Sequence, residues 1–399
     1  MSAKCFLESG PHHGAARRSE DTRHSLAAPL ARQSRVLRRA KQQSSHLIFA
    51  PSTNGLSLGS SRRRNQEVCC YAGAEQLDGL RYHGSSSLAE HIFEENYRVG
   101  ELLGVGSFGK VYRATHRSET APDYAVKIVS KHREGFLDER VARRIHEEID
   151  TLRQLQDRPE VVRLIDTFED NDRVWIVTEL CSGGDLEHFM KDYGHMAEAE
   201  AAHAAHDILQ VLAECHRKGI CYADVKPANF LLTRPYRRSG KGDDSRLLEL
   251  RTTDFGCSQR IQESGKLNKR TGTPLYMAPE LFMRYYGVES DQWALGIMMY
   301  QMLSGHLPFW NAQSDRSPFA VMSAILSAEV CYDGPEWKAV SDEAKDFLSK
   351  LLDRDYNTRM TAAEGLQHPW IAKFCGGDVC LAAENNVQLP PATPQESLR

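Results

Sequence analysis

The chain has 399 residues, of which 41% are hydrophobic and 26% are charged. This composition is typical of a globular protein and excludes a wholly disordered chain. No stretch approaches the roughly 18 consecutive apolar residues that a membrane-spanning helix needs, so a transmembrane protein is excluded. Ten cysteines are scattered without a CxxC pair, which excludes a disulfide scaffold and a zinc ribbon.

The net charge of -4 hides a strong asymmetry along the chain. Residues 1–66 contain 12 Lys and Arg against 3 Asp and Glu, a net of +9, whereas the rest contains 38 against 51, a net of -13. With 11 serines and no apolar period, the first segment is typical of an organelle transit peptide. Residues 68–72, after three arginines, resemble a plastid processing region. The alternative is a disordered basic tail on a cytoplasmic protein, which would bind anionic surfaces nonspecifically.

Regular structure is predicted from near Tyr97, after a segment 1–92 that we expect to have no fold. Between Tyr97 and Ser130, β-branched and aromatic residues alternate with polar ones around glycine turns, which predicts a short antiparallel sheet. From Glu139 to Leu155 the apolar residues recur at helical spacing and predict an amphipathic helix. Strands are predicted at 161–165 and 174–180, and from Ala197 onward the chain is mostly helical.

Residues 103–111 form a glycine-rich motif that reads Leu-Gly-Val-Gly-Ser-Phe-Gly-Lys-Val. Its three glycines are Gly104, Gly106 and Gly109, and without side chains they let backbone amides approach phosphate oxygens. A dinucleotide-binding turn has the same spacing but opens a helix, whereas a strand-like run follows here. The motif therefore favours a strand-turn-strand cover over phosphates.

Lys127 lies inside the apolar run 124–129. A lysine in such a strand must either extend its ammonium to solvent or meet a partner charge. Glu148, on the helix that follows, is the preferred partner over Glu147, because it directly precedes the core residue Ile149. The alternative is a surface lysine on an edge strand with an unrelated glutamate.

A polar cluster follows at Asp224, Lys226 and Asn229, with Asp254 in an Asp-Phe-Gly motif 30 residues after Asp224. Phosphoryl transfer needs a group that orients the attacking hydroxyl, cations on the transferred phosphate and ligands for Mg²⁺. Asp224 suits the first role and Lys226 the second, while the oxygens of Asn229 and Asp254 suit a hard cation. The alternative is two loop carboxylates on a solvated surface.

An Ala-Pro-Glu motif ending at Glu280 closes the series, and its order and spacing resemble the eukaryotic protein kinase family. The resemblance covers residues 97–372 and implies an α+β bilobal fold, with a small N-terminal sheet lobe (97–180), a larger helical lobe (181–372) and a polar tail (373–399). Lys226 and the Gly-Thr-Pro-Leu-Tyr run at 272–276 are the serine/threonine form of the family's loops. The implied activity is transfer of the γ-phosphate of ATP, with Mg²⁺, to serine or threonine of protein substrates.

The resemblance also implies further site residues. It pairs Glu280 with Arg359, makes Asp291 part of a buried central helix, and makes Lys127, Glu148, Asp224, Lys226, Asn229 and Asp254 the catalytic set. Asn229 and Asp254 would hold the metal. The nucleotide would lie against Leu103, Gly104, Gly106, Gly109, Val111, Ala125, Lys127, Thr178, Glu179, Cys181 and Asp185.

Within the family, residues 303–310 and 359–370 are most similar to the calcium/calmodulin-dependent group, especially the catalytic domain of plant and algal calcium-dependent kinases. An EF-hand needs a 12-residue loop of spaced oxygens, and the residues after Trp370 contain none. They also lack a basic amphipathic helix, so neither calcium nor calmodulin binding is expected. No nucleic-acid partner and no membrane span is expected.

The chain departs from the family pattern in the catalytic loop and in the segment from Asp254 to Glu280, the activation segment. Ala223 replaces the arginine that normally binds an activation-segment phosphate, and Lys269 occupies the usual phosphoacceptor position. Both the phosphate-binding arginine and the phosphoacceptor are therefore missing. We expect this segment to be ordered by other contacts or the protein to be controlled by abundance. Thr273 is expected to support the catalytic aspartate.

Two further departures concern the substrate. Ala228 and Gln301 are neutral where basic-directed relatives carry carboxylates, which argues against a strong preference for basic substrates.

Ala223 is the one feature that favours a pseudokinase without turnover. A phosphotransferase for small molecules is disfavoured by the complete segment that seats a peptide. Cys181 and Cys257 are interpreted as small buried hydrophobes in preference to redox sensors.

Overall fold

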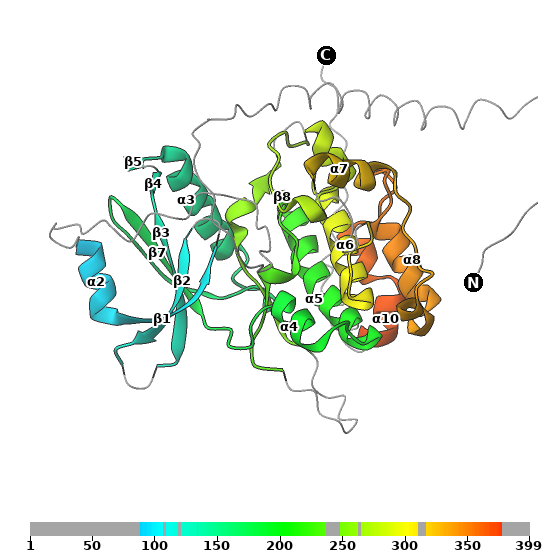
Figure 1. Ribbon diagram of the computed structural model, residues 1–399. Helices are drawn as coiled ribbons and strands as arrows, with labels where there is room; N and C mark the ends of the chain where they lie inside the picture. Colours follow the sequence, from blue (N-terminus) through cyan, green and yellow to red (C-terminus); the bar gives the residue numbers. More distant parts are fainter. Residues whose placement is uncertain are drawn as a thin grey trace, which may run out of the picture. The chain divides into compact units, whose positions relative to one another are not determined.

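The computed structural model describes residues 88–106, 109–118, 121–133, 135–236, 248–261, 265–309 and 317–376. A five-stranded antiparallel sheet comes first, in the order β1-β2-β3-β7-β6 (Figure 1). Its strands are β1 (Tyr97–Val105), β2 (Lys110–His116), β3 (Asp123–Ser130), β7 (Arg173–Glu179) and β6 (Leu164–Glu169). The register places Lys127 of β3 between Val111 of β2 and Ile176 of β7. The lysine predicted to stand in an apolar strand therefore lies in the centre of the sheet.

Helix α3 (Glu139–Gln154) follows a small hairpin of β4 (His132–Arg133) and β5 (Phe136–Leu137). The Asp138 side chain caps its first turn by accepting from the backbone N–H of Arg140 and Val141. Ile145, Ile149 and Leu152 are buried, as their helical spacing predicts. The helix predicted from Glu139 is thus confirmed, with Leu155 as its C-terminal cap.

An additional helix, α2 (Leu88–Asn96), precedes the sheet. The predicted boundary at residue 92 was therefore wrong: the described structure already begins at Leu88, and residues 1–87 lie outside it. Only Phe93 of this helix is buried, where it stacks on Tyr97 and Trp175. The nine residues have no strong apolar period, so the helix depends on tertiary contacts that a local pattern does not reveal.

The predicted strand at 161–165 begins later than expected, at Leu164. Val161 instead forms a parallel bridge with Thr252, and the N–H of Val162 donates to the Thr252 carbonyl at 3.0 Å. The run was apolar because Val161 and Val162 are buried between the sheet and the following lobe, not because they pair in the sheet. This backbone contact ties the two lobes together.

The second lobe is mainly helical. Its α-helices are α4 (Leu186–Tyr193), α5 (Glu198–Arg217), α6 (Glu289–Ser304), α7 (Pro318–Ser327), α8 (Asp342–Leu351), α9 (Ala362–Leu366) and α10 (Pro369–Cys375). Two small antiparallel sheets pair β9 (Phe230–Leu232) with β10 (Leu250–Thr252) and β8 (Ile220–Cys221) with β11 (Gln259–Arg260). Short 3-10 helices at Pro227–Asn229, Phe255–Cys257, Pro274–Tyr276, Pro279–Met283 and Pro335–Ala339 complete the lobe.

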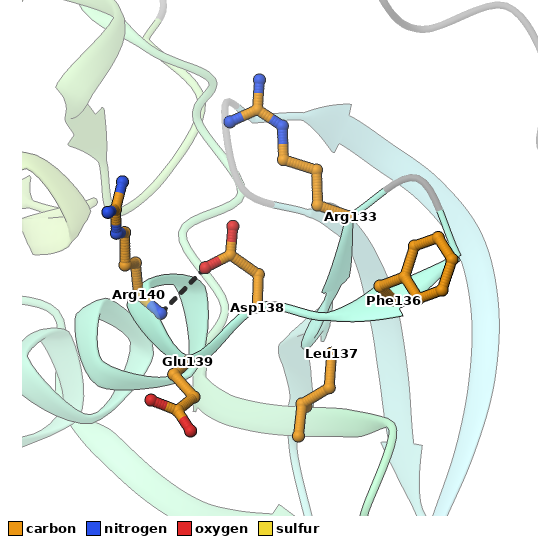
Figure 2. Close-up of a pocket in the computed structure, with 6 residues that line it drawn as sticks. All are labelled: Arg133, Phe136, Leu137, Asp138, Glu139 and Arg140. Carbon is orange, nitrogen blue, oxygen red and sulfur yellow. Dashed lines mark hydrogen bonds between the residues drawn. The ribbon is translucent and has the colours of Figure 1, made fainter.

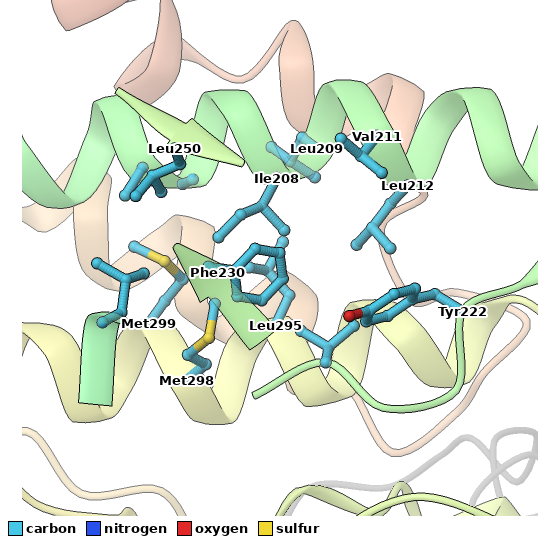
Figure 3. Packing of buried hydrophobic residues seen from close by; sticks show 14 of the residues in the cluster. Ile208, Leu209, Val211, Leu212, Tyr222, Phe230, Leu250, Leu295, Met298 and Met299 are labelled. Carbon is cyan, nitrogen blue, oxygen red and sulfur yellow. The ribbon is translucent and has the colours of Figure 1, made fainter. Parts of the chain in front are cut away.

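The core of this lobe lies between α5 and α6. Figure 3 shows Tyr222, Phe230 and Leu250 among apolar side chains from both helices. Thirteen of the 16 residues of α6 are buried, which explains why its sequence is apolar on all sides. The catalytic loop between β8 and β9 is therefore built on a rigid base.

The element order matches the predicted α+β architecture of a small sheet lobe followed by a helical lobe. Helix α10 extends to Cys375, so the boundary predicted for the tail at residue 373 falls inside a helix, and the tail after Gly376 lies outside the described residues. Within the described part of the chain, every helix is too short or too polar to cross a bilayer.

Candidate active site

Lys127 lies at the centre of one half of the site. Its Nζ is 2.7 Å from Glu148 Oε1 and 2.9 Å from Asp254 Oδ1. Strand β3, helix α3 and the turn after β10 thus bring three charges to one point from distant parts of the chain. Glu147 is exposed and does not take this position, so the structure selects Glu148 as the partner.

The protonation states in this cluster follow from its charges. Burial lowers the pKa of Lys127, but the carboxylates of Glu148 and Asp254 outweigh it and raise the pKa above its ordinary value. Burial raises the pKa of Asp254, but the charge and hydrogen bond of Lys127 and the charge of Lys226 together hold it below its ordinary value. An ammonium and an ionised carboxylate therefore stand side by side at neutral pH.

Asp224 is the centre of the other half. Its Oδ2 accepts from Lys226 Nζ at 2.7 Å and from Asn229 Nδ2 at 3.2 Å, and its Oδ1 accepts from Thr273 Oγ1 at 2.9 Å. The backbone N–H of Thr273 donates to the same Oδ1 at 3.0 Å. These contacts fix the carboxylate in one orientation, and they place Thr273 as the support that was expected.

Asp291 of α6 stabilises the loop that carries Asp224. Its two carboxylate oxygens accept from the backbone N–H of Tyr222 at 2.9 Å and of Ala223 at 2.8 Å. Ala223 adopts a left-handed φ of 64°, and the carboxylate compensates for this strained backbone. The Tyr222 hydroxyl donates to the Thr253 carbonyl at 2.6 Å and links the loop to the residue before Asp254.

Gly272 lies against this strained residue. A Cβ at Gly272 would stand 2.3 Å from the Ala223 carbonyl oxygen, and the glycine itself has a φ of 92°. The activation segment therefore passes the catalytic loop at Gly272, where only glycine fits.

A divalent cation fits the donors available here. Asn229 is buried and donates its amide nitrogen to the Asp224 carbonyl at 2.8 Å, which leaves its amide oxygen for another ligand. Together with the ionised carboxylate of Asp254 this gives two oxygen donors, and Mg²⁺ is commonly held by one or two protein oxygens plus phosphate and water. Among the described residues, no group of three or more His, Cys, Asp or Glu forms a metal cage.

The glycine-rich motif forms the turn between β1 and β2. Gly104 pairs with Val111, and the N–H of Gly106 donates to the Gly109 carbonyl at 2.8 Å. A Cβ at Gly109 would stand 2.5 Å from the Ile128 carbonyl oxygen, so the turn can close over β3 only with glycine. The tip, at 107 and 108, lies outside the described residues. A strand follows the motif, as predicted, and no helix opens there.

The remaining predicted nucleotide residues follow the sheet to its junction with the second lobe. Ala125 pairs with Thr178 in the β3–β7 register, and Glu179 accepts from the backbone N–H of Arg163 at 2.8 Å through its side chain. Cys181 is partly buried, and burial raises its pKa to about 12. Asp185 caps α4 by accepting from the N–H of His188 at 2.8 Å. Leu103 remains 46% exposed on β1.

The activation segment is held by unmodified side chains. Gln259 Nε2 donates to Thr271 Oγ1 at 3.0 Å and to the Tyr286 hydroxyl at 2.8 Å, and that hydroxyl donates to the Lys269 carbonyl. Leu267 and Tyr286 exchange backbone hydrogen bonds in an isolated bridge. The contacts of Gln259, Thr271, Tyr286 and the Lys269 carbonyl are called the activation clasp.

At the end of this segment Glu280 meets Arg359. Arg359 donates from Nη1 at 2.5 Å and from Nη2 at 3.0 Å to the two carboxylate oxygens, and both side chains are buried. The expected ion pair is therefore present and bidentate.

Cys257, beside Asp254, is partly buried; burial and the charges of Asp224 and Asp254 raise its pKa to about 11. This thiol is protonated at neutral pH, in line with the interpretation as a small hydrophobe.

Sequence reasoning located the charged residues of both halves and the contacts of Glu148 and Thr273, but it missed the side chains that hold the activation segment. The roles of Gln259 and Tyr286 in the activation clasp had no local signal, because each is a single polar residue in an irregular segment. Asp291 did carry one: it is an acid at the start of an almost wholly apolar helix, where burial demands hydrogen-bond donors.

Comparisons with known proteins agree with this geometry. Residues 97–371 match the protein kinase domain. The chain is 36% identical to a CDPK-related protein kinase of Daucus carota over 282 residues, which cover 70% of this chain and 44% of the relative. It is 35% identical to calcium-dependent protein kinase 14 of Arabidopsis thaliana over 295 residues, which cover 74% of this chain and 52% of the relative.

A third relative, calcium-dependent protein kinase 7 of Arabidopsis thaliana, is 36% identical over 282 residues, 70% of this chain and 50% of the relative. The chain thus spans about half the length of the curated relatives it matches. The resemblance and the bilobal fold predicted from the sequence are confirmed: this chain belongs to the protein kinase family.

Proposed function

We propose that the chain is a serine/threonine protein kinase that transfers the γ-phosphate of ATP to hydroxyl groups of protein substrates. The observation that carries the proposal is the convergence of Lys127, Glu148 and Asp254 in one half of the site with Asp224, Lys226 and Asn229 in the other. The charge of Lys226 acts on Asp254, so the two halves share one electrostatic environment.

Each side chain has a role that its contacts support. Lys127, fixed by Glu148, would bind phosphate oxygens of the nucleotide. Asp224, oriented by Thr273, would hold the acceptor hydroxyl and take its proton. Lys226 lies beside Asp224 and would offset the negative charge that develops on the transferred group. A Mg²⁺ ion on Asn229 and Asp254 would neutralise phosphate charge when it is bound.

Nucleotide binding is assigned to the sheet and its junction. Gly104, Gly106 and Gly109 would present backbone N–H groups to phosphates. The base and ribose would lie against a set drawn from β1, β2, β3, β7 and the segment after β7: Leu103, Val111, Ala125, Thr178, Glu179, Cys181 and Asp185. Since Asp185 Oδ2 lies 2.8 Å from His188 Nδ1, ribose binding would compete with that contact.

The proposed kinase does not need a phosphate on its activation segment. Ala223 offers no cation to such a phosphate, and the activation clasp holds the segment without one. Lys127, Glu148 and Asp254 are in contact in the same unmodified chain. The clasp therefore replaces the ordering contact that the catalytic loop has lost.

We further propose that phosphate transfer by this chain needs no calcium. Relatives are named calcium-dependent, but the sequence after Trp370 contains no 12-residue loop of spaced oxygens and only Lys373 and Arg399 as cations. The test is activity with a calcium chelator and excess Mg²⁺. Unchanged incorporation supports calcium independence, and a collapse on chelation that calcium reverses would overturn it.

The enzymatic proposal is tested with the purified chain, labelled ATP, Mg²⁺ and a generic protein substrate, followed by identification of the phosphorylated amino acid. Phosphoserine or phosphothreonine is expected. Phosphotyrosine would contradict the serine/threonine assignment. ATP binding without any transfer would favour the pseudokinase that Ala223 suggests.

Residues 1–66 are proposed as a plastid transit peptide on composition alone, and they lie outside the described residues. The test is the N-terminal sequence of the mature protein recovered from plastids. An N-terminus near residues 68–72 supports the proposal. Recovery of the uncleaved chain from the cytoplasm would leave the basic segment as a tail.

A further inference from the structure

We propose that Arg251 of β10 is a positioning residue for nucleotide binding. With Glu179, the last residue of β7, it forms an ion pair between the two lobes, here called the interlobe clamp. The clamp would hold the lobes at the angle at which Lys127 meets Asp254. The inference rests on the proposed function, since the molecule bound between the lobes would be ATP, and it adds a residue that the sequence motifs do not include.

The Glu179 side chain has partners on both lobes. Its Oε1 accepts from the backbone N–H of Arg163 at 2.8 Å, while the backbone N–H of Glu179 donates to the Arg163 carbonyl at 3.0 Å. The same Oε1 lies 3.5 Å from Nε of Arg251. The carboxylate is therefore fixed within the first lobe and paired with an arginine of the second.

Arg251 is fixed in its own lobe as well. Its Nη2 donates to Glu249 Oε1 at 2.8 Å, and its Nη1 donates to the Leu250 carbonyl at 3.0 Å. Its side chain is 16% exposed and that of Glu179 is 26% exposed, so solvent screens this pair less than a pair at the surface. Because the guanidinium is already held by two other groups, pairing with Glu179 costs little side-chain entropy.

The segment from Arg251 to Asp254 contacts the first lobe at three of its four positions. The clamp lies at its first residue. Thr252, the second, exchanges backbone hydrogen bonds with residues 160 and 162 at 2.7 and 3.0 Å. Asp254, the last, lies 2.9 Å from Lys127 Nζ. The first lobe thus rests on one short segment, with an ion pair at each end.

The same strand fixes the two oxygen donors proposed for the metal. β10 pairs with β9, which begins directly after Asn229, and β10 ends two residues before Asp254. The backbone N–H of Thr253 donates to the Asn229 carbonyl at 3.0 Å. A change in the angle between the lobes would therefore displace Lys127 relative to both donors. Since a bound nucleotide contacts both lobes at once, the angle controls its binding.

Loss of the clamp is expected to widen the range of lobe angles and so to reduce the fraction of molecules that can bind ATP. The apparent dissociation constant rises by the inverse of that fraction. Saturating ATP restores the bound angle, so kcat should change little. A purely structural role gives the opposite result, because unfolded protein lowers the measured kcat and leaves the KM of the folded molecules unchanged.

The test uses the full chain with Arg251→Gln, Glu179→Gln and the double variant. Glutamine at position 179 keeps an oxygen for the Arg163 N–H and removes only the charge. Each single variant is expected to raise the KM for ATP, and the Kd for Mg-ADP measured by calorimetry, about five- to tenfold, with kcat within about twofold. The double variant should match the single variants, because one contact is lost in all three.

Two arginines outside the clamp serve as matched controls. Arg140, shown in Figure 2, lines an open hollow of about 460 Å³ beside the first turn of α3, and its backbone N–H, which glutamine retains, donates to Asp138 at 2.9 Å. Arg234 is 77% exposed and lies 3.8 Å from Glu249, the carboxylate that also binds Arg251. Arg140→Gln and Arg234→Gln should keep both constants within about twofold of the unaltered chain.

The outcomes separate the clamp from the proposed function. An unchanged KM for ATP in Arg251→Gln, with or without a fall in kcat, would overturn the inference alone. So would a rise in the double variant equal to the product of the two single rises, because the residues would then act independently. If no protein transfers phosphate but the variants still weaken Mg-ADP binding, the clamp stands and the proposed function fails. Absence of nucleotide binding by the unaltered chain would remove both.

Discussion

The hydroxyl of Thr273 donates to Asp224 Oδ1 at 2.9 Å, and the backbone N–H of the same threonine donates to the same oxygen at 3.0 Å. The activation segment therefore sets the orientation of the Asp224 carboxylate directly. Lys226 occupies the other oxygen and also reaches Thr273 Oγ1 at 3.3 Å, which closes a ring of three side chains. A change in the conformation of the activation segment should therefore alter the orientation of the Asp224 side chain.

Loss of the Thr273 hydroxyl is expected to lower kcat with little effect on the KM for ATP. In Thr273→Val the backbone N–H still reaches Asp224, so we expect a decrease of about tenfold, the value of one lost hydrogen bond to a charged group. Thr273→Ser keeps the hydroxyl and should retain most of the activity. Steady-state kinetics of both variants checks this, and equal activity of Val and Ser variants would show that the hydroxyl does not orient Asp224.

Helix α3 offers a matched pair of neighbouring glutamates. Glu148→Gln removes the charge that positions Lys127, and we expect kcat/KM to fall by about 100-fold, as for other preorganised charge contacts. Glu147→Gln, next in the chain and exposed, should stay within about twofold, as surface substitutions usually do. Similar losses in both variants would contradict the assignment of Glu148.

The activation clasp predicts how activity responds to dephosphorylation. Treatment with a phosphatase should leave the rate of phosphate transfer unchanged, because unmodified Gln259 and Tyr286 order the segment. The double variant Gln259→Ala, Tyr286→Phe loses three of these hydrogen bonds and should lower kcat/KM by about tenfold or more. A phosphatase-sensitive enzyme in which the double variant is fully active would show that a phosphate, not the clasp, orders the segment.

Helix α2 is predicted to be part of the folded unit. Phe93 is buried between Tyr97, Phe168 and Trp175, so Phe93→Ala should lower the free energy of unfolding by about 3–5 kcal/mol. Leu88, on the same helix, is 76% exposed, and Leu88→Ala should change it by less than about 0.5 kcal/mol. Denaturant unfolding of the two variants gives the comparison. Equal stability would place α2 outside the cooperative unit.

The sequence predicted the fold where local pattern and tertiary structure agree. Helix α3 has a cap, an apolar period and a buried face in register, so its start at Glu139 was predictable. Strand β6 was placed too early because Val161 and Val162 are apolar for a different reason, burial between the lobes. Periodicity reports burial and does not report which partner provides it.

The candidate site likewise has residues that a sequence pattern predicts and contacts that it does not predict. Lys127, Glu148, Asp224, Lys226, Asn229 and Asp254 were predicted to form one site because their motifs follow one another in a defined order and spacing. The structure brings their side chains together in two groups of contacts. The contacts that hold the activation segment were less accessible to sequence reasoning. The hydrogen bonds from Gln259 to Thr271 and Tyr286 join positions 12 and 27 residues apart through irregular chain, and no spacing rule relates them. The sequence indicates that a buried Asp291 needs hydrogen-bond donors, but it does not indicate that these donors are the backbone amides of Tyr222 and Ala223.

The central claim is that Asp224 and Lys127 lie in one catalytic site, and the most direct measurement is the rate of phosphate transfer from Mg-ATP to a generic protein substrate. The unaltered chain is compared with Asp224→Asn and Lys127→Met at equal concentrations of folded protein. Each variant is expected to lose about 100-fold or more of the rate, as expected when a general base or a preorganised charge is removed. Equal phosphate incorporation by all three proteins would contradict the claim.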